Sequence, residues 1–240
     1  MTTRHLRTAL HAIVALLPQA LKRPIYRRAF GFEIADDAEL GLSVLDVDHL
    51  EVGAGARIGH GNLLTRVGAV RLKTGAEIGH LNVLRGGDEI SLGAYATVMR
   101  FNVLNSIPDN DCEGPTDPRL LLAEGAFVVS GHRLDFTDRI AIGKNVIVAG
   151  RSSSLWTHNR QSTSPIEIGD FCYLGSEVRI APGAKLGDFS ILGMGAVLTG
   201  DGAGRTVLGG VPAKPIRSID ATDEDRLRKK TKHTIPSSLY

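Results

Sequence analysis

Six consecutive hexapeptides occupy residues 168–203: IGDFCY, LGSEVR, IAPGAK, LGDFSI, LGMGAV and LTGDGA. Each block opens with Ile or Leu, and its fifth place holds a small or modest side chain, from Cys172 to Gly202. Six residues make about 1.7 turns of an α-helix, so a helix would not keep these positions on one face. A short strand followed by a sharp turn every six residues would keep them there.

The same frame continues upstream with a longer period. Three hexapeptides make one coil of 18 residues, and most upstream coils carry two extra residues at one corner. The pattern predicts an all-β solenoid, a left-handed parallel β-helix of about eight coils between Ile34 and Ala203. Hexapeptides start at Ile34, Leu40, Asp46 and Val52, and the next coils start at Leu72 and Leu92. A ten-residue insertion follows, after which coils start at Leu122 and Ile142.

The two ends of the chain differ from the repeat. Residues 1–31 form a basic arm with helical apolar spacing, residues 32–217 form the β-helix domain, and residues 218–240 form a tail with a short helix. The arm either packs across the open first coil, whose strand edges are unpaired, or lies on an anionic membrane surface; the two are compatible. Its apolar stripe is Leu6, Leu10, Ile13, Val14, Leu17, Leu21, Ile25 and Phe30, and Thr222-x-x-Asp225 predicts a capping box for the C-terminal helix.

The charge distribution excludes one class of partner. No acidic residue precedes Glu33, whereas the arm carries six Lys/Arg; the body, 32–217, has 17 Lys/Arg against 22 Asp/Glu. An acidic body is not typical of a nucleic-acid-binding protein. The arm lacks the ~20 apolar residues of a membrane span. Cys112 and Cys172 are too few for a disulfide framework or a zinc site, so we expect reduced thiols in a cytoplasmic protein, with the inner membrane face as a further location.

Asn62, Asn82 and Asn102 take the same place in three successive coils. This predicts a ladder of side-chain amides that are bonded from coil to coil. His132 takes that place in the next coil, where it either ends the ladder or contributes to an active site.

A second column of polar residues lies two places earlier, at His60, His80 and Arg100. The arginine argues against a metal site, so we interpret the column as ordinary surface residues.

Residues 140–217 closely resemble the hexapeptide-repeat acyltransferases, in the branch of galactoside, maltose and surface-polysaccharide O-acetyltransferases. The resemblance is carried by SPIEIGDFCYLGSEVRIAPGAKLGDFSILGMGAV and GGVPAKPIR, and the arm segment LLPQALKRPIYRRAFGFEI resembles the lead-in of polysaccharide-modifying members. It implies an acetyl-CoA-dependent O-acetyltransferase that acts on a sugar hydroxyl. The γ-class carbonic anhydrases share the repeat, but no His-x4-His pair occurs here, so no metal is expected.

The segment SSSLWTHNRQSTSPIEIG contains the predicted base. The coil that starts at Ile142 is followed by the next only at Ile168, and the eight extra residues come almost directly after His158. His158 should therefore stand at the root of a protruding loop, where catalytic groups concentrate. The resemblance implies that His158 is the general base and that the backbone N–H of Ser176 stabilises the oxyanion.

The resemblance also implies contacts with acetyl-CoA and suggests residues for the acceptor. One departure is Thr199-Gly200-Asp201, where relatives often have Thr-Lys-Asp, which removes a cation from the nucleotide end. Beside the base, Trp156 could stack on a sugar, Arg160 could meet an acidic sugar or a phosphate, and His132 is a third candidate. The implied acetyl-CoA contacts are Ser176, Met194, Gly195 and Thr199 along the pantetheine arm and Lys214 and Arg217 near the phosphates.

Flat prism faces and a protruding loop predict a homotrimer with three sites between subunits. Two other functions remain open from the sequence. One is N-acyl transfer to an amino sugar, and the other is a non-catalytic β-helix scaffold.

Overall fold

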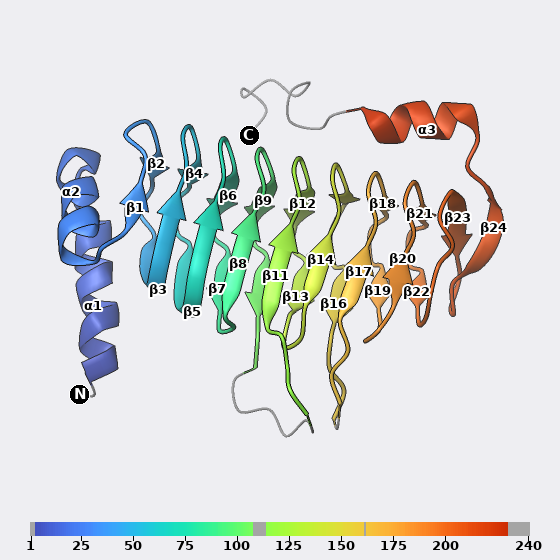
Figure 1. Ribbon diagram of the computed structural model, residues 1–240, viewed down its shortest axis with the longest axis horizontal. Coiled ribbons are helices and arrows are strands. Elements are labelled where there is room, and N and C mark those ends of the chain that lie inside the picture. The colour runs from blue at the N-terminus through green and yellow to red at the C-terminus, as the bar shows by residue number, and fades with distance from the viewer. Residues whose placement is uncertain (1–2, 108–113, 161, 230–240) are drawn as a thin grey trace.

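The computed structural model describes residues 3–107, 114–160 and 162–229. They form one long solenoid that begins with two helices and ends with a third (Figure 1). Each complete coil contributes three short strands, so the solenoid has three faces, which we call A, B and C in the order in which a coil visits them. The prediction of a left-handed parallel β-helix of about eight coils is confirmed.

Parallel pairing between successive coils builds the faces, and β23 and β24 are antiparallel. Faces B and C form one sheet because β3 (Val44–Val52) and β5 (Leu63–Leu72) run around their common corner. Face A contains β2 (Glu39–Leu40), β4 (Arg57–Ile58), β6 (Glu77–His80), β9 (Thr97–Arg100), β12 (Phe127–Ser130), β15 (Ile147–Val148), β18 (Tyr173–Leu174), β21 (Ile191–Leu192), β23 (Thr206–Gly209) and β24 (Lys214–Ser218). Face B continues with β7 (Val83–Arg85), β10 (Val103–Asn105), β13 (Arg133–Asp135), β16 (Ser154–Trp156), β19 (Arg179–Ile180) and β22 (Val197–Leu198). Face C contains β1 (Glu33–Ile34), β8 (Glu89–Leu92), β11 (Arg119–Leu122), β14 (Ile140–Ile142), β17 (Ile166–Ile168) and β20 (Lys185–Leu186).

The hexapeptide frame predicted the core correctly. The first and fifth places between Ile168 and Leu198 are all buried inside the prism. Glycine occurs at two places of the hexapeptide for two different reasons. The fourth place has a left-handed φ, which Gly195 adopts at +72° and Phe171 also adopts at +56°. At the second place, a Cβ on Gly175 would lie 2.7 Å from the backbone nitrogen of Met194, so this glycine is needed because the next coil is close.

The predicted asparagine ladder is confirmed. The Oδ1 atom of Asn62 accepts hydrogen bonds from the backbone N–H and the Nδ2 of Asn82, at 2.9 and 3.0 Å. Asn82 accepts the same pair from Asn102, at 2.9 and 3.2 Å. All three side chains are buried, and the next backbone N–H to bond to the ladder is that of His132.

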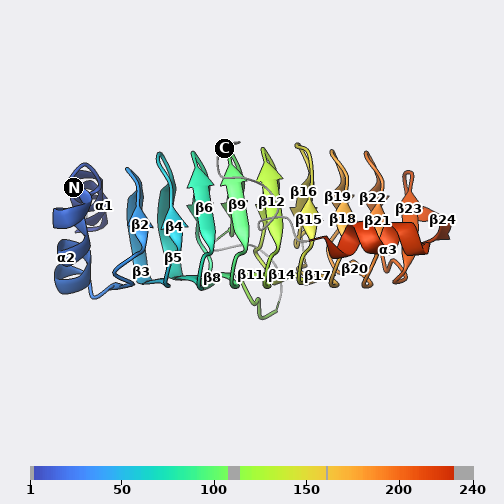
Figure 2. The same cartoon turned by 90° about the horizontal axis from the view of Figure 1, so that it is seen from above.

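The basic arm closes the first coil, as one of the two predictions stated. Helices α1 (Thr3–Ala15) and α2 (Gln19–Ala29) lie across the end of the solenoid (Figures 1 and 2). Basic side chains of α2 donate hydrogen bonds to backbone carbonyls that have no preceding coil to bond them. These bonds run from Lys22 to Gly41 (2.8 Å), from Arg23 to Ala38 (2.8 Å) and from Arg27 to Ile34 (2.9 Å).

The orientation of the arm agrees with the prediction in part. Val14 of the apolar stripe is buried in the core, and Leu17, Ile25 and Phe30 pack against it, whereas Leu6, Leu10, Ile13 and Leu21 are exposed. His11, Lys22 and Tyr26 are buried as well. The open coil presents carbonyl oxygens, which need donors, and apolar side chains alone would have left them unpaired. In the described part of the chain, no helix combines the length and apolarity needed to span a bilayer.

At the other end, β24 pairs with β23, and α3 (Ala221–Arg228) lies back along the preceding coils, where Arg228 covers the rings of Phe171 and Phe189 (Figure 1). The predicted capping box at Thr222 is wrong by two residues, because the N-cap is Asp220. Its carboxylate accepts from the backbone N–H of Asp223 at 2.8 Å, and the Asp223 side chain accepts from the Asp220 N–H at 3.3 Å. Thr222 lies inside the first turn.

Candidate active site

A loop leaves the solenoid between β16 and β17 and carries His158 at its root, as the spacing predicted. The backbone of His158 forms an antiparallel bridge with Thr163, and the N–H of Ser164 donates to the carbonyl of Thr157 at 2.8 Å. The two ends of the loop are therefore paired with each other like the strands of a narrow hairpin. This pairing fixes where the backbone of His158 leaves face B.

His158 is bonded to a buried carboxylate from the preceding coil. Its Nδ1 lies 3.1 Å from Oδ1 of Asp135, the last residue of β13. The Asp135 side chain has no exposed surface, whereas 17% of the His158 side chain is exposed. In the register of face B, Asp135 is the partner of Trp156, two residues before His158. The pair is thus assembled from two successive coils.

Three further donors surround the Asp135 carboxylate. The Thr137 hydroxyl and backbone N–H lie 2.7 and 3.3 Å from Oδ1, and Nδ2 of Asn105 lies 3.2 Å from Oδ2. An ionised carboxylate only accepts hydrogen bonds, so the Nδ1 of His158 must carry the proton that it shares with Asp135. In neutral His158 the lone pair is then on Nε2, the nitrogen that is free to accept a proton.

Thr157 holds the start of the loop against the preceding coil. Its buried hydroxyl donates to the backbone carbonyl of Asp135 at 2.9 Å and accepts from the backbone N–H of Asp138 at 2.9 Å. The residue before the histidine is therefore tied to the strand that supplies the carboxylate. This arrangement orients the imidazole before any substrate binds.

Two predicted acceptor residues flank the histidine. The ring of Trp156 lies 6.1 Å from that of His158, centroid to centroid. The Arg133 guanidinium lies 4.8 Å above the Trp156 ring, so one face of the indole is already covered. Arg160 is exposed on the loop.

His132 lies in the ladder and away from solvent. Its Nδ1 accepts from the backbone N–H of Ser153 at 3.2 Å, and only 1% of the residue is exposed. Burial lowers the pKa of His132 to about 4, against a hydrogen bond to the Val148 backbone that acts in the opposite direction. This geometry favours the interpretation of His132 as the end of the ladder.

The two cysteines have different outcomes. Cys172 is a free, buried thiol, and burial raises its pKa to about 12. Cys112 lies outside the described residues.

The structure separates the predicted cofactor residues from His158, the predicted base. Ser176, Met194 and Gly195 lie at the corner between faces A and B, whereas His158 follows face B at the corner with face C. About five residues of extended chain separate the two corners, or roughly 15 Å at ~3.3 Å per residue. Thr199 lies on the histidine side, directly after β22. One subunit therefore does not bring all of these groups together.

The corner at Ser176 is open to a ligand. Met194 is 78% exposed. The backbone N–H of Ser176 has no hydrogen-bond partner among the described residues. A Cβ on Gly150 would lie 1.7 Å from the Ser176 hydroxyl, so the missing side chain makes room for this serine. These features fit a thioester carbonyl that needs a backbone donor.

Lys214 and Arg217 both lie on β24, at the end of face A. Arg217 is paired with Asp223 of α3, and this hydrogen bond raises the pKa of the guanidinium. Its role in holding the C-terminal helix competes with a role at the CoA phosphates. Among the described residues, no three His, Cys, Asp or Glu side chains gather as metal ligands.

Sequence reasoning missed Asp135. It occupies an outward place of face B that Arg85 and Asn105 fill in the two preceding coils, so the repeat gives no sign that it is buried. The available signal was the register, since an acidic residue in one coil stands beside the coil that carries the loop histidine.

The chain has relatives among named acetyltransferases. A search against models of known protein families found no match. The chain is 31% identical over 101 residues to the galactoside O-acetyltransferase of Escherichia coli K12, a match that covers 40% of this chain and 50% of that enzyme. The chain thus spans about half the length of this relative.

Solved structures share the solenoid. LpxA from Acinetobacter baumannii superposes with a TM-score of 0.56 at 16% identity, covering 85% of this chain and 76% of that one. The polySia-specific acetyltransferase NeuO gives a TM-score of 0.53 at 15% identity, covering 81% and 96%. The resemblance predicted from the repeat is confirmed: the chain is related in sequence to named acetyltransferases and has the left-handed β-helix fold of the hexapeptide-repeat acyltransferases.

Proposed function

We propose that this chain is an acetyl-CoA-dependent O-acetyltransferase that acts on a sugar hydroxyl, in the biosynthesis of a surface polysaccharide or glycoconjugate. The observation that carries the proposal is His158, whose Nδ1 is held by the buried Asp135 and whose Nε2 is left to accept a proton. The names of the sequence relatives support the acetyl group, and that of the E. coli enzyme supports transfer to a sugar.

The reaction assigned to His158 is a proton transfer. Acetyl-CoA supplies an acetyl group on a thioester. Nε2 takes the proton of the acceptor hydroxyl as its oxygen attacks the thioester carbonyl, and it returns that proton to the departing thiolate. Asp135 stabilises the imidazolium during this interval without taking up the proton itself. The Ser176 N–H donates to the carbonyl oxygen as negative charge develops there.

The distance between the two corners supports a homotrimer with shared sites. His158 of one subunit and the Ser176 corner of a neighbour would meet if face B packed against another copy. Exposed apolar side chains on this side of the solenoid support such packing. They are Leu42, Leu63, Leu81, Phe101 and Val103.

Mixing two inactive variants tests the shared site. His158→Ala removes the base, and Met194→Glu places a negative charge at the exposed corner. If each site uses both subunits, mixed trimers recover part of the activity, whereas either variant alone stays inactive. A monomer with full activity would refute the shared site and leave the base assignment intact.

Acetyl transfer itself is tested with radiolabelled acetyl-CoA and a panel of glycans. The product label should be released by mild alkaline hydroxylamine, which cleaves esters and leaves amides intact. Label that resists this treatment would indicate the alternative, N-acyl transfer to an amino sugar. A chain whose melting temperature does not respond to acetyl-CoA would be a scaffold.

The proposed location is the cytoplasm, because acetyl-CoA is the donor. The outward face of α1 and the turn after it support additional contact with a lipid surface through Leu6, Leu10, Ile13 and Leu16. Most cations of the arm are engaged with the first coil, so such binding would be largely apolar and insensitive to salt. Co-sedimentation with vesicles at low and high salt measures this directly.

A further inference from the structure

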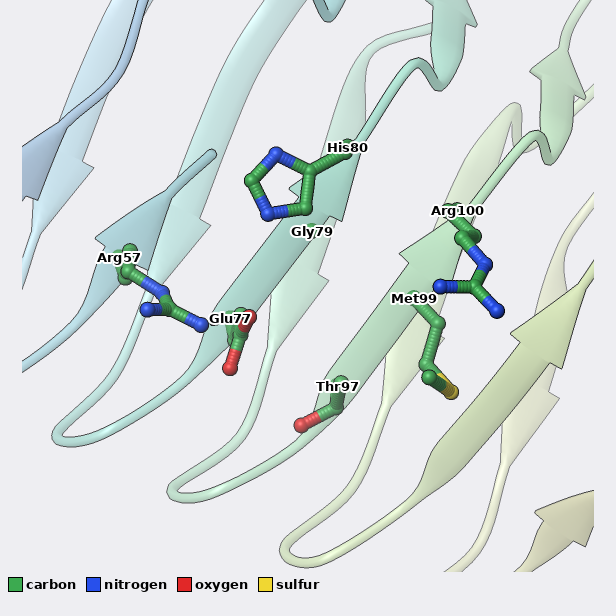
Figure 3. A pocket seen from close by; sticks show the side chains of 7 residues that line it. All are labelled: Arg57, Glu77, Gly79, His80, Thr97, Met99 and Arg100. Carbon is green, nitrogen blue, oxygen red and sulfur yellow. Dashed lines mark hydrogen bonds and ion pairs between the residues drawn. The ribbon is translucent and has the colours of Figure 1, made fainter. Parts of the chain in front are cut away.

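We propose that a pocket on face A, between β4, β6 and β9, binds the phosphate group of a small ligand. It is lined by Arg57, Glu77, Gly79, His80, Thr97, Met99 and Arg100 (Figure 3). The pocket lies about three coils from His158 and on another face. It is therefore separate from the proposed transferase site.

The floor of the pocket is bare backbone. Gly79 carries no side chain, and a Cβ there would lie 2.0 Å from the carbonyl oxygen of Met99. Arg57 and Arg100 flank this floor from opposite sides (Figure 3). A ligand in the pocket would thus lie between two guanidinium groups.

His80 lines the pocket and presents a donor. Nδ1 of His60 accepts from the backbone N–H of Leu42 at 3.0 Å, and Nδ1 of His80 accepts from the backbone N–H of His60 at 2.9 Å. A neutral imidazole that accepts at Nδ1 carries its proton on Nε2. His80 is therefore a hydrogen-bond donor toward its surroundings.

Thr97 supplies the second, independent observation. Its residue is 3% exposed, and its hydroxyl has no hydrogen-bond partner among the described residues. Buried hydroxyls in folded proteins nearly always have a partner. Thr97 belongs to the pocket lining, and a ligand oxygen would satisfy its hydroxyl after a small shift of the side chains that now cover it.

The charges select the ligand class. Glu77 is bonded to one nitrogen of Arg57 at 2.6 Å, which leaves the other Arg57 nitrogens. Arg100 has no ion pair within the described residues. Two guanidinium groups, an imidazole N–H and a hydroxyl against one carboxylate form a set of mostly donors. A tetrahedral oxyanion with several acceptor oxygens suits such a set, and arginine binds phosphate in this way.

The test titrates the whole chain with inorganic phosphate, glucose 1-phosphate and acetate. Thermal unfolding and the ring signals of 15N-labelled histidines are followed together. Both phosphates should raise the melting temperature and shift the His80 ring signals but not those of His158, and acetate should do neither. Tighter binding of glucose 1-phosphate would identify a phosphoester as the source, and equal binding would identify free phosphate.

Two variants locate the effect. Arg100→Gln should weaken phosphate binding roughly tenfold or more, because a charge-assisted bond is lost. Thr97→Val should also weaken binding, while the unliganded protein stays at least as stable, because an unpaired buried hydroxyl is removed. Arg66→Gln is the control, since Arg66 is an exposed arginine at another corner of the solenoid. This variant should bind phosphate as the wild type does.

Three results would overturn the proposal. The first is phosphate binding that leaves the His80 signals unchanged. The second is an Arg66→Gln variant that loses as much affinity as Arg100→Gln. The third is a Thr97→Val variant that unfolds more easily than the wild type without ligand, because the hydroxyl would then have a structural partner. None of these readouts depends on acetyl transfer.

Discussion

The asparagine ladder and the Asp135–His158 pair are both buried polar groups in the same solenoid, and they are built in opposite ways. The ladder repeats one residue at one corner, and each amide is bonded to its own kind in the next coil. The pair joins residues of different kinds from successive coils, and Thr137, Asn105 and Thr157 around it have no repeats. A polar side chain that recurs with the coil stabilises the stack, whereas one that occurs once and is fully bonded marks a site.

The largest effect on activity should come from a substitution in the Asp135–His158 pair. His158→Ala should lower kcat by about 10²–10⁴, the usual contribution of a positioned base. Acetyl-CoA binding should be unchanged, because the proposed contacts lie on other coils, and the melting temperature should fall only slightly, because the buried Asp135 keeps three other donors. Steady-state kinetics with a calorimetric scan measure both.

The control for this variant is His132→Ala, which should lose stability and keep turnover near that of the wild type. The reverse pattern, with His158→Ala active and His132→Ala folded but inactive, would move the active site to the preceding coil.

The next effect concerns the middle rung of the ladder. Asn82→Leu removes the acceptor of the Asn102 amide and of its backbone N–H, and the donor to Met99. Each buried polar group left unpaired costs about 1–3 kcal/mol. Urea unfolding should show this loss, with activity per folded molecule unchanged. An unchanged midpoint would mean that the ladder does not stabilise the stack.

Asp135→Asn should have a smaller effect on rate. The amide keeps the shape but can present its NH₂ to Nδ1, which favours the wrong tautomer of His158. We expect kcat to fall roughly ten- to a hundredfold, the contribution of one hydrogen bond to a charged group. The pH–rate profile separates this role from simple support of the fold. A variant with wild-type rate at every pH would show that the carboxylate does not position the base.

The smallest effect concerns His132, which lies between the asparagine ladder and the Asp135–His158 pair. The folded pKa of His132 is about 4, whereas an unfolded histidine takes up its proton near 6.5. The unfolded state therefore binds more protons between these values, so stability is full above pH 6.5 and falls as the pH drops toward 4. His132→Asn, which continues the ladder, should reduce the loss between pH 6.5 and pH 5 by on the order of 1 kcal/mol.

Urea midpoints at both pH values provide the measurement for this variant. His49→Asn, at an exposed histidine, should keep the wild-type slope. The slope that remains in His132→Asn belongs in part to His11, whose pKa burial also lowers to about 4. Equal slopes in all three proteins would remove His132 from the acid response.

The features that recur from coil to coil could be predicted from the sequence, whereas the features that occur once were harder to predict. The hexapeptide frame, the ladder and the loop at His158 follow from spacing alone. Asp135 did not, because its burial depends on how the loop from the next coil folds back over it. The polar contacts of α2 with the first coil did not either, since apolar spacing takes no account of the unpaired carbonyls there. The separation of Ser176 from His158 required knowing the corner at which each residue lies.

The contacts at the two ends have a consequence for how such a rod changes in evolution. Lys22 and Arg23 bond to the first coil, β24 pairs with the last strand of face A, and α3 lies back along the coils of Phe171 and Phe189. A whole coil could therefore be duplicated or lost between β5 and β8 without disturbing either terminus. The same event between β13 and β16 would part Asp135 from His158. The rod thus has a segment of adjustable length followed by one of fixed length, and lineages should differ in size in the first and keep the second constant.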